Sequence, residues 1–127
     1  ARALAAHGGV RAAIDLPDGL AADAAHIARR SGVGLMLDYH ALPLSPALRA
    51  LGEAVGVDPR QLAFGGGEDY ELCIAAAPDA VAGLQAVAAS EDLTLTDVGC
   101  FDGEEGFGLV GSRASDDEPA RGWDHFG

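Results

Sequence analysis

Apolar residues recur along the chain with two different periods, which predict helices and strands in alternation. Over 18–31, the apolar positions Leu20, Ala24 and Ile27 follow helical spacing, and Asp23 falls off that apolar face. Short apolar runs bounded by Gly, Pro or Asp predict strands. The other predicted helices cover 1–8, 46–55, 58–62 and 78–89, and the predicted strands cover 11–16, 33–39, 70–75, 93–101 and 106–110.

This order of elements predicts the fold class. Most strands alternate with helices, but the strands over 93–101 and 106–110 follow one another and are expected to be neighbours in a hairpin-like turn. The expected architecture is therefore an α/β (α+β) sandwich, a mixed β-sheet with helices packed on it. No internal repeat or linker divides the chain, so residues 1–127 are expected to form a single domain.

The helix over 46–55 has a clear start signal. Ser45 is a favourable N-cap residue, and the proline that follows it is tolerated in the first helical turn. The apolar spacing is expected to turn Leu48, Leu51 and Val55 toward the core.

Two carboxylates, those of Asp15 and Asp18, stand at the carboxyl end of the strand over 11–16 and at the start of the helix that follows it. Ligands of α/β sheets gather at the carboxyl ends of strands, and Mg²⁺ takes carboxylate oxygens together with phosphates. The alternative is a helix start, with Asp15 as N-cap, Pro17 in the first turn and Asp18 at the far end of a capping box. These residues alone favour capping, because Asp-x-x-Asp is common at helix starts.

Two further stretches are candidates for ligand binding. Gly65-Gly66-Gly67 allows the backbone to approach a ligand closely, and Glu68 and Asp69 follow at once, before a strand that should be buried. A solvated turn is the alternative explanation for that stretch. The aromatic residues of Trp123-Asp124-His125-Phe126 either dock on the core or form a flat wall for a planar heteroaromatic ligand.

The charge balance excludes several classes of partner. The formal net charge is −12, and the eight basic residues are all arginine. An acidic chain is a poor partner for nucleic acid or an anionic membrane, and the absence of lysine excludes a Walker-type phosphate loop. If the ligand is itself anionic, metal ions must offset the repulsion.

Cysteine and histidine usage predicts a reducing, cytoplasmic location without a zinc site. Cys73 lies in an apolar run and is expected to be a small core residue; it forms no CxxC pair with Cys100. The four histidines are scattered, and no segment reads as a signal peptide or a membrane span. The opening residues read as the last turns of a helix, so the chain is expected to be the carboxyl-terminal part of something longer.

Together these motifs resemble the carboxyl-terminal domain of the thiamine-monophosphate kinase family, within the aminoimidazole-ribonucleotide-synthetase superfamily. Each motif is weak alone, but their order along the chain is specific. The matching segments are Asp15-Leu16-Pro17-Asp18-Gly19-Leu20, His26, Ser31-Gly32-Val33, Leu42-Pro43-Leu44-Ser45, Gly66-Gly67-Glu68-Asp69-Tyr70-Glu71-Leu72 and Gly122-Trp123-Asp124-His125-Phe126.

The resemblance implies ATP-dependent phosphorylation of thiamine monophosphate to thiamine diphosphate, with several Mg²⁺ ions. It implies that Asp15 and Asp18 are metal ligands and that Glu68 and Trp123 contact the substrate, whereas no residue is assigned as catalytic. The family has a serine, expected to contact ATP, where this chain has Pro17, which offers neither a hydroxyl nor an N–H.

The resemblance also implies that an amino-terminal domain is missing. That domain would supply most metal ligands, the nucleotide loop and the contact of a homodimer, so the isolated chain is expected to be inactive. Two other functions remain open: an ATP-dependent synthetase of the same superfamily, and a degenerate binding or scaffold domain without catalysis, which the replacement at Pro17 favours.

Overall fold

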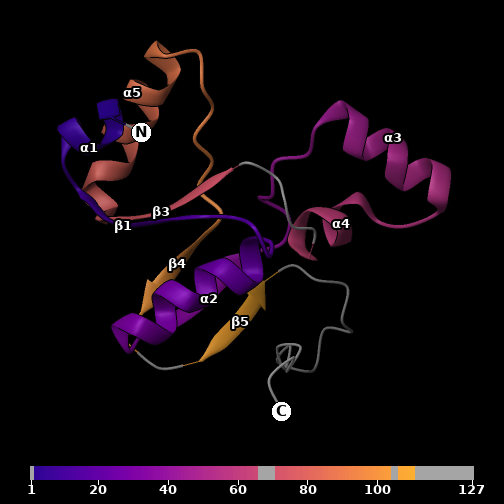
Figure 1. Ribbon diagram of the computed structural model, residues 1–127, viewed down its shortest axis with the longest axis horizontal. Helices are drawn as coiled ribbons and strands as arrows, with labels where there is room; N and C mark the ends of the chain where they lie inside the picture. Colours follow the sequence, from indigo (N-terminus) through magenta and orange to yellow (C-terminus); the bar gives the residue numbers. More distant parts are fainter. Residues whose placement is uncertain (1, 66–70, 104–105, 111–127) are drawn as a thin grey trace.

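The computed structural model describes residues 2–65, 71–103 and 106–110 (Figure 1). Helices and strands appear close to the predicted ranges, except that the strand predicted over 93–101 is wrong over 93–98 and is formed only at Gly99–Asp102. They are α1 (Arg2–His7), β1 (Val10–Asp15), α2 (Leu20–Ser31), β2 (Gly34–Asp38), α3 (Pro46–Val55), α4 (Pro59–Gly65), β3 (Leu72–Ala76), the short 3₁₀ helix η1 (Pro78–Ala80), α5 (Val81–Ser90), β4 (Gly99–Asp102) and β5 (Phe107–Val110).

The described strands form two small sheets. Strands β1 and β3 pair antiparallel, and β2 lies between β4 and β5 in the second sheet. Helix α2 packs against both β1 and β2, while α1 and α5 pack together on the other side of the β1–β3 pair (Figure 1). The mixed α/β class is confirmed, with the strands divided between two sheets that α2 connects.

The expected hairpin between the last two strands is wrong. Strand β4 pairs antiparallel with β2, and β5 pairs parallel with the opposite edge of β2. Leu35 and Leu37 of β2 are buried, so this strand is central, and a partner on each edge satisfies its backbone donors and acceptors. Neighbouring strands in a sequence suggest a local turn, but they do not reveal that a third strand separates them.

The core lies between α2 and β2. Leu20, Ala24 and Ala28 of α2 pack with Leu35 and Leu37 of β2. Helix α2 ends at Gly32, whose backbone adopts the left-handed conformation that favours glycine at helix ends. The helical periodicity therefore located this core correctly. None of the helices in the described ranges is long and apolar enough to span a bilayer.

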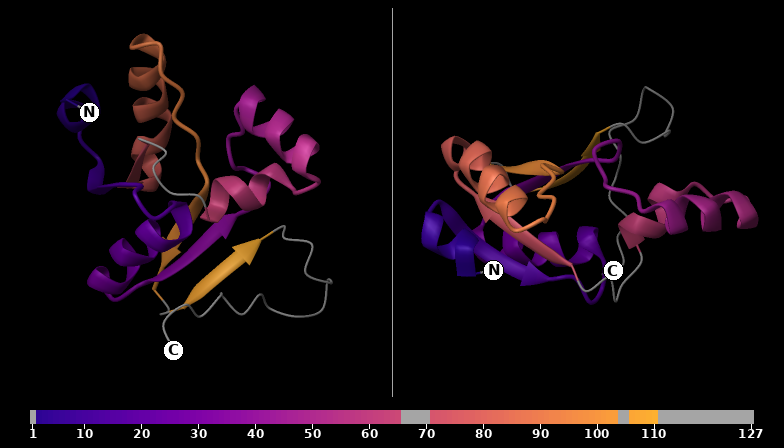
Figure 2. Two further views of the ribbon diagram at one scale, coloured as in Figure 1. Left: turned by 45° about the vertical axis from the view of Figure 1, so that its right-hand side comes forward. Right: turned by 90° about the horizontal axis from the view of Figure 1, so that it is seen from above.

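Helix α3 is correctly predicted in extent but not in packing. The Ser45 hydroxyl accepts a hydrogen bond from the backbone N–H of Leu48 at 3.1 Å, which confirms the predicted cap. However, Leu51 is 51% exposed and Val55 is 56% exposed, so the expected inward position is wrong for these two residues, whereas Leu48 is half-buried. The helix packs chiefly against α4 and extends away from both sheets (Figure 2). Periodicity identifies residues that share a face, but not whether any element covers that face.

Candidate functional site: the acidic turn before α2

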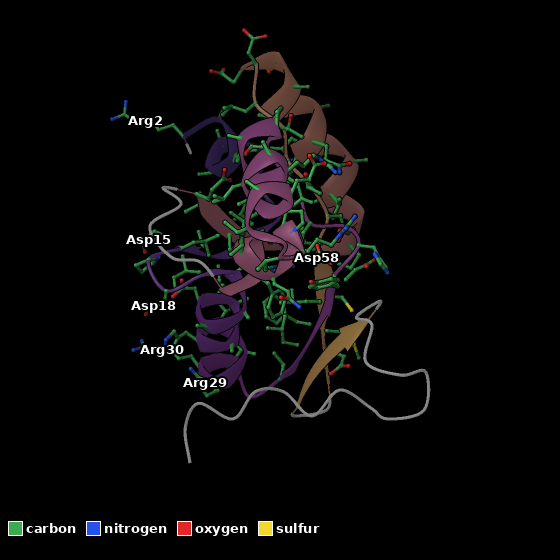
Figure 3. The ribbon with its side chains drawn as sticks, turned by 90° about the vertical axis from the view of Figure 1, so that its right-hand side faces the viewer. Arg2, Asp15, Asp18, Arg29, Arg30 and Asp58 are labelled. Carbon is green, nitrogen blue, oxygen red and sulfur yellow. The ribbon has the colours of Figure 1, made fainter. Side chains whose placement is uncertain are left out.

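The turn between β1 and α2 exposes two carboxylates on one side of the molecule. Asp15 is the last residue of β1 and Asp18 stands in the turn; both are exposed. Figure 3 shows both side chains on the same side of the molecule. Pro17, between them, is also exposed. We call residues 15–19 the acidic turn.

The helix-start interpretation of this turn is wrong. The N-cap of α2 is Gly19, with φ +98°, and no side chain makes a capping hydrogen bond there. Glycine adopts this backbone conformation readily, which lets the chain enter the helix abruptly. The carboxylates of Asp15 and Asp18 are therefore not used to cap α2 and remain open to a ligand.

The sequence did not predict that the Asp23 side chain is buried next to the acidic turn. It was expected to lie off the apolar face of the helix, yet it is 2% exposed. Its Oδ2 accepts a hydrogen bond from the backbone N–H of Asp18 at 3.0 Å, and its own N–H donates to the carbonyl of Gly19 at 3.0 Å.

Donor atoms that a cation could use meet where the acidic turn enters α2, in a group that includes Asp18 but not Asp15. One ligand atom each from Asp18, Asp23 and His26 lies within 4.8 Å of the others. Carboxylate oxygens are the donors that Mg²⁺ prefers. The Nδ1 of His26 accepts a hydrogen bond from Nη2 of Arg29 at 2.9 Å, so that nitrogen is engaged. The carboxylate oxygens of Asp18 and Asp23 therefore fit a magnesium ion better than a zinc ion.

A hollow of about 370 Å³ lies beside the acidic turn, between β1 and α2. It is lined by Ala12, Ala13, Ile14, His26, Ile27, Arg30 and Ser31. Most of its walls are apolar, and it shares only His26 with the group of possible metal ligands. The acidic turn is therefore a surface feature, and another surface is needed to enclose a phosphate against it.

The glycine-rich stretch begins and ends at described residues that are held near this turn. Strand β3 starts at Leu72, which pairs with Asp15. On the other side of the stretch, Phe64 of α4 packs against the core cluster that contains Leu16 of the turn and Leu20 of α2. The predictions for Glu68 and Trp123 fall outside the described residues and stay predictions.

Cys73 of β3 pairs with Ile14, the residue before the acidic turn, and its reactivity tests the geometry of this region. Burial, and then the negative charge of Asp23, raise the pKa of the Cys73 thiol above its ordinary value. The thiolate is the reactive form, so alkylation of Cys73 should accelerate only at a higher pH than for an ordinary cysteine. At neutral pH we expect Cys100, which is exposed, to react with iodoacetamide faster than Cys73.

Mass spectrometry of the labelled peptides across a pH series measures both rates in one sample. Asp23→Asn should move the pH profile of Cys73 toward lower pH, because the neutral amide no longer opposes the thiolate. Equal rates for the two cysteines at every pH would show that Cys73 is neither buried nor close to Asp23.

Comparison with known proteins supports the predicted resemblance. No family model matches the chain. A thiamine-monophosphate kinase of Aquifex aeolicus is 36% identical over 115 residues, which cover 91% of this chain and 34% of that protein. The crystal structure of thiamine-monophosphate kinase from Stenotrophomonas maltophilia K279a has a TM-score of 0.72 and 44% identity, and the match covers 83% of this chain and 33% of that one.

A second solved structure is that of AaThiL complexed with AMPPCP and TMP. Its TM-score is 0.68 at 33% identity, and the match covers 84% of this chain and 32% of that one. The chain thus spans about a third of the length of the relatives it matches. It is similar to thiamine-monophosphate kinases in sequence and in structure, which confirms the resemblance predicted from its motifs.

Proposed function

We propose that this chain is the carboxyl-terminal domain of a kinase that phosphorylates thiamine monophosphate to thiamine diphosphate, with ATP as phosphoryl donor and Mg²⁺ as cofactor. The observation that carries the proposal is the exposed carboxylate pair of Asp15 and Asp18, neither of which caps the helix that follows. Two of the similar proteins are named thiamine-monophosphate kinase, and a third, AaThiL, has a solved structure in complex with AMPPCP and TMP.

In this proposal, Asp15 and Asp18 hold Mg²⁺. When bound, the metal neutralises negative charge on the phosphate oxygens, which phosphoryl transfer needs more than it needs a strong base. The net charge of −12 makes such neutralisation necessary, because an acidic chain would otherwise repel two phosphorylated ligands. The absence of an assigned catalytic base agrees with this chemistry.

Glu68 and Trp123 are proposed to contact thiamine monophosphate. The support for Glu68 is its position in the sequence, four residues before Leu72, which pairs with Asp15 at the end of β1. A carboxylate can accept hydrogen bonds from the amino group of a pyrimidine. The support for Trp123 is chemical, since a tryptophan ring stacks well on a planar or cationic heterocycle.

The rest of the site is proposed to come from an amino-terminal domain that precedes residue 1. A chain that spans about a third of its relatives, and whose acidic turn lies open on the surface, agrees with this division. The same missing part would supply the nucleotide loop and the contact of a homodimer. In this proposal the 127-residue chain alone has no kinase activity.

The test is an assay of the purified full-length protein and of residues 1–127 alone, with ATP, Mg²⁺ and thiamine monophosphate. The full-length protein should form thiamine diphosphate, and omission of Mg²⁺ should abolish the product. Turnover by residues 1–127 alone would overturn the division of the site. Activity of the full-length protein only toward a phosphoribosyl substrate would instead support a synthetase of the same superfamily.

Pro17 favours one further candidate, a domain that has lost nucleotide binding and serves as a binding or scaffold module. Isothermal calorimetry of the full-length protein with Mg²⁺ and a non-hydrolysable ATP analogue separates the two functions. Measurable binding supports the kinase, and absence of heat together with absence of turnover supports the scaffold.

Replacing Pro17 by serine should strengthen nucleotide binding. Pro17 is exposed in the acidic turn and lacks both a hydroxyl and an N–H, whereas serine supplies both donors. One added hydrogen bond is worth about 0.5–1.5 kcal/mol, so the Kd for the ATP analogue should fall by roughly two- to twelve-fold. Calorimetry of the full-length Pro17→Ser protein measures this change.

The matched control for that variant is Pro43→Ser, an exposed proline in the connector after β2. It makes the same chemical change outside the acidic turn and should leave the Kd unchanged. An unchanged Kd for Pro17→Ser would show that this position does not face the nucleotide.

A further inference from the structure

We propose that Asp23 is a positioning residue for the acidic turn: its buried carboxylate holds the backbone of Asp18, so that the Asp18 side chain is presented beside Asp15. This inference rests on the proposed function, because it assumes that Asp15 and Asp18 bind Mg²⁺. The inference adds a buried residue, Asp23, to a site whose proposed ligands, Asp15 and Asp18, are exposed.

The hydrogen bonds of Asp23 fasten the turn to the first turn of α2. Oδ2 of Asp23 accepts from the backbone N–H of Asp18, and the backbone N–H of Asp23 donates to the Gly19 carbonyl, both at 3.0 Å. Pro17 has no N–H, so Asp18 offers the first backbone donor after it. Gly19, with φ +98°, would leave the turn free to move without such a bond.

The hydrogen bond from Asp18 helps to explain why the Asp23 carboxylate is buried. A carboxylate is expensive to bury unless hydrogen bonds or a nearby cation compensate it. Asp23 is 2% exposed, and among the described residues the recorded donor to its carboxylate is the N–H of Asp18. A hydrogen bond to an ionised acceptor is stronger than a neutral one, so this bond restrains the turn firmly.

The distance between the two carboxylates raises a competing explanation. A ligand oxygen of Asp23 lies within 4.8 Å of one of Asp18, so Asp23 could hold the ion itself, or act through its charge, instead of through its hydrogen bond. The two roles respond differently to substitution. Asparagine keeps an oxygen acceptor at nearly the same place and removes the charge, whereas glutamate keeps the charge and shifts the acceptor by one methylene.

The experiment measures Mn²⁺ binding to the full-length protein without nucleotide, by the electron paramagnetic resonance signal of free Mn²⁺. Asp18→Asn is the reference for loss of a ligand. Groups that orient metal ligands typically change metal affinity by about ten- to a hundred-fold, so Asp23→Ala should weaken Mn²⁺ binding by that factor. Asp23→Asn should stay within about five-fold of the wild type, and Asp23→Glu should lie close to Asp23→Ala.

The control for general damage to α2 is Ala28→Gly. Ala28 is buried on the same helix, and glycine there lowers helix stability without touching the turn. This variant should melt at a lower temperature and bind Mn²⁺ as the wild type does. If Asp23→Ala does not fold, the contrast between Asp23→Asn and Asp23→Glu decides the question.

Three results would overturn the inference while the proposed function stands. They are an unchanged Mn²⁺ affinity in both Asp23→Ala and Asp23→Glu, an equal loss in Asp23→Asn and Asp23→Ala, and a loss in Ala28→Gly as large as that in Asp23→Ala. If Asp18→Asn itself binds Mn²⁺ as the wild type does, the metal role proposed for the turn fails, and the inference fails with it.

Discussion

Replacing Asp18 by asparagine in the full-length protein should lower the rate of thiamine diphosphate formation by at least about a hundred-fold, the size of effect found when one group that stabilises transition-state charge is removed. The amide is neutral and a weaker ligand than the carboxylate, so the phosphate charge is less well compensated. Because the Asp18 carboxylate is exposed and does not cap α2, the substitution should leave the fold intact.

The assay must cover a wide range of Mg²⁺ concentrations, because a weakened metal site is partly restored by excess metal. Asp92→Asn is the matched control: Asp92 is exposed after α5 and has φ +57°, a conformation that asparagine accepts. It should keep wild-type activity. Wild-type rates for Asp18→Asn at every Mg²⁺ concentration would contradict the proposed metal site.

Replacing Leu84 by alanine should destabilise the chain by about 2–5 kcal/mol, the usual effect of truncating a buried leucine. Leu84 of α5 is 0% exposed, so the removed atoms leave a cavity that its neighbours can fill only in part. The free energy of unfolding, measured by urea denaturation with far-UV circular dichroism, reports the change.

The same truncation at a surface leucine serves as its control. Leu93 is 59% exposed shortly after α5, and Leu93→Ala should change the free energy of unfolding by no more than about 0.5 kcal/mol. Similar losses for the two variants would show that Leu84 is not part of a closely packed interior.

Local elements of the fold could be predicted from the sequence, because their signals lie within a few residues. The periodicity of α2, the glycine at its end and the Ser45 cap of α3 are all local, and the structure confirms them. The pairing of β2 with both β4 and β5 depends on contacts between distant segments, which no local pattern encodes. The exposed face of α3 was missed for the same reason.

The residues of the candidate site likewise divide into those that the sequence predicted and one that it did not. Asp15 and Asp18 stand out in the sequence because they stand at the end of an apolar run that predicts a strand, and the structure leaves both carboxylates exposed on one side. Asp23 was not found, because an acidic residue in the first turn of a helix ordinarily faces water. Only the backbone path through Gly19 shows that its carboxylate turns inward toward Asp18.

The isolation of α3 has a consequence for motion. Because this helix packs chiefly on α4 and extends away from both sheets, its opening breaks few contacts with the rest of the fold. Regions of this kind unfold locally while the core stays intact, and their amide hydrogens exchange with solvent early. Backbone deuterium should therefore enter Pro46–Val55 well before it enters Leu20–Ser31, so that the chain loses its order in separate steps.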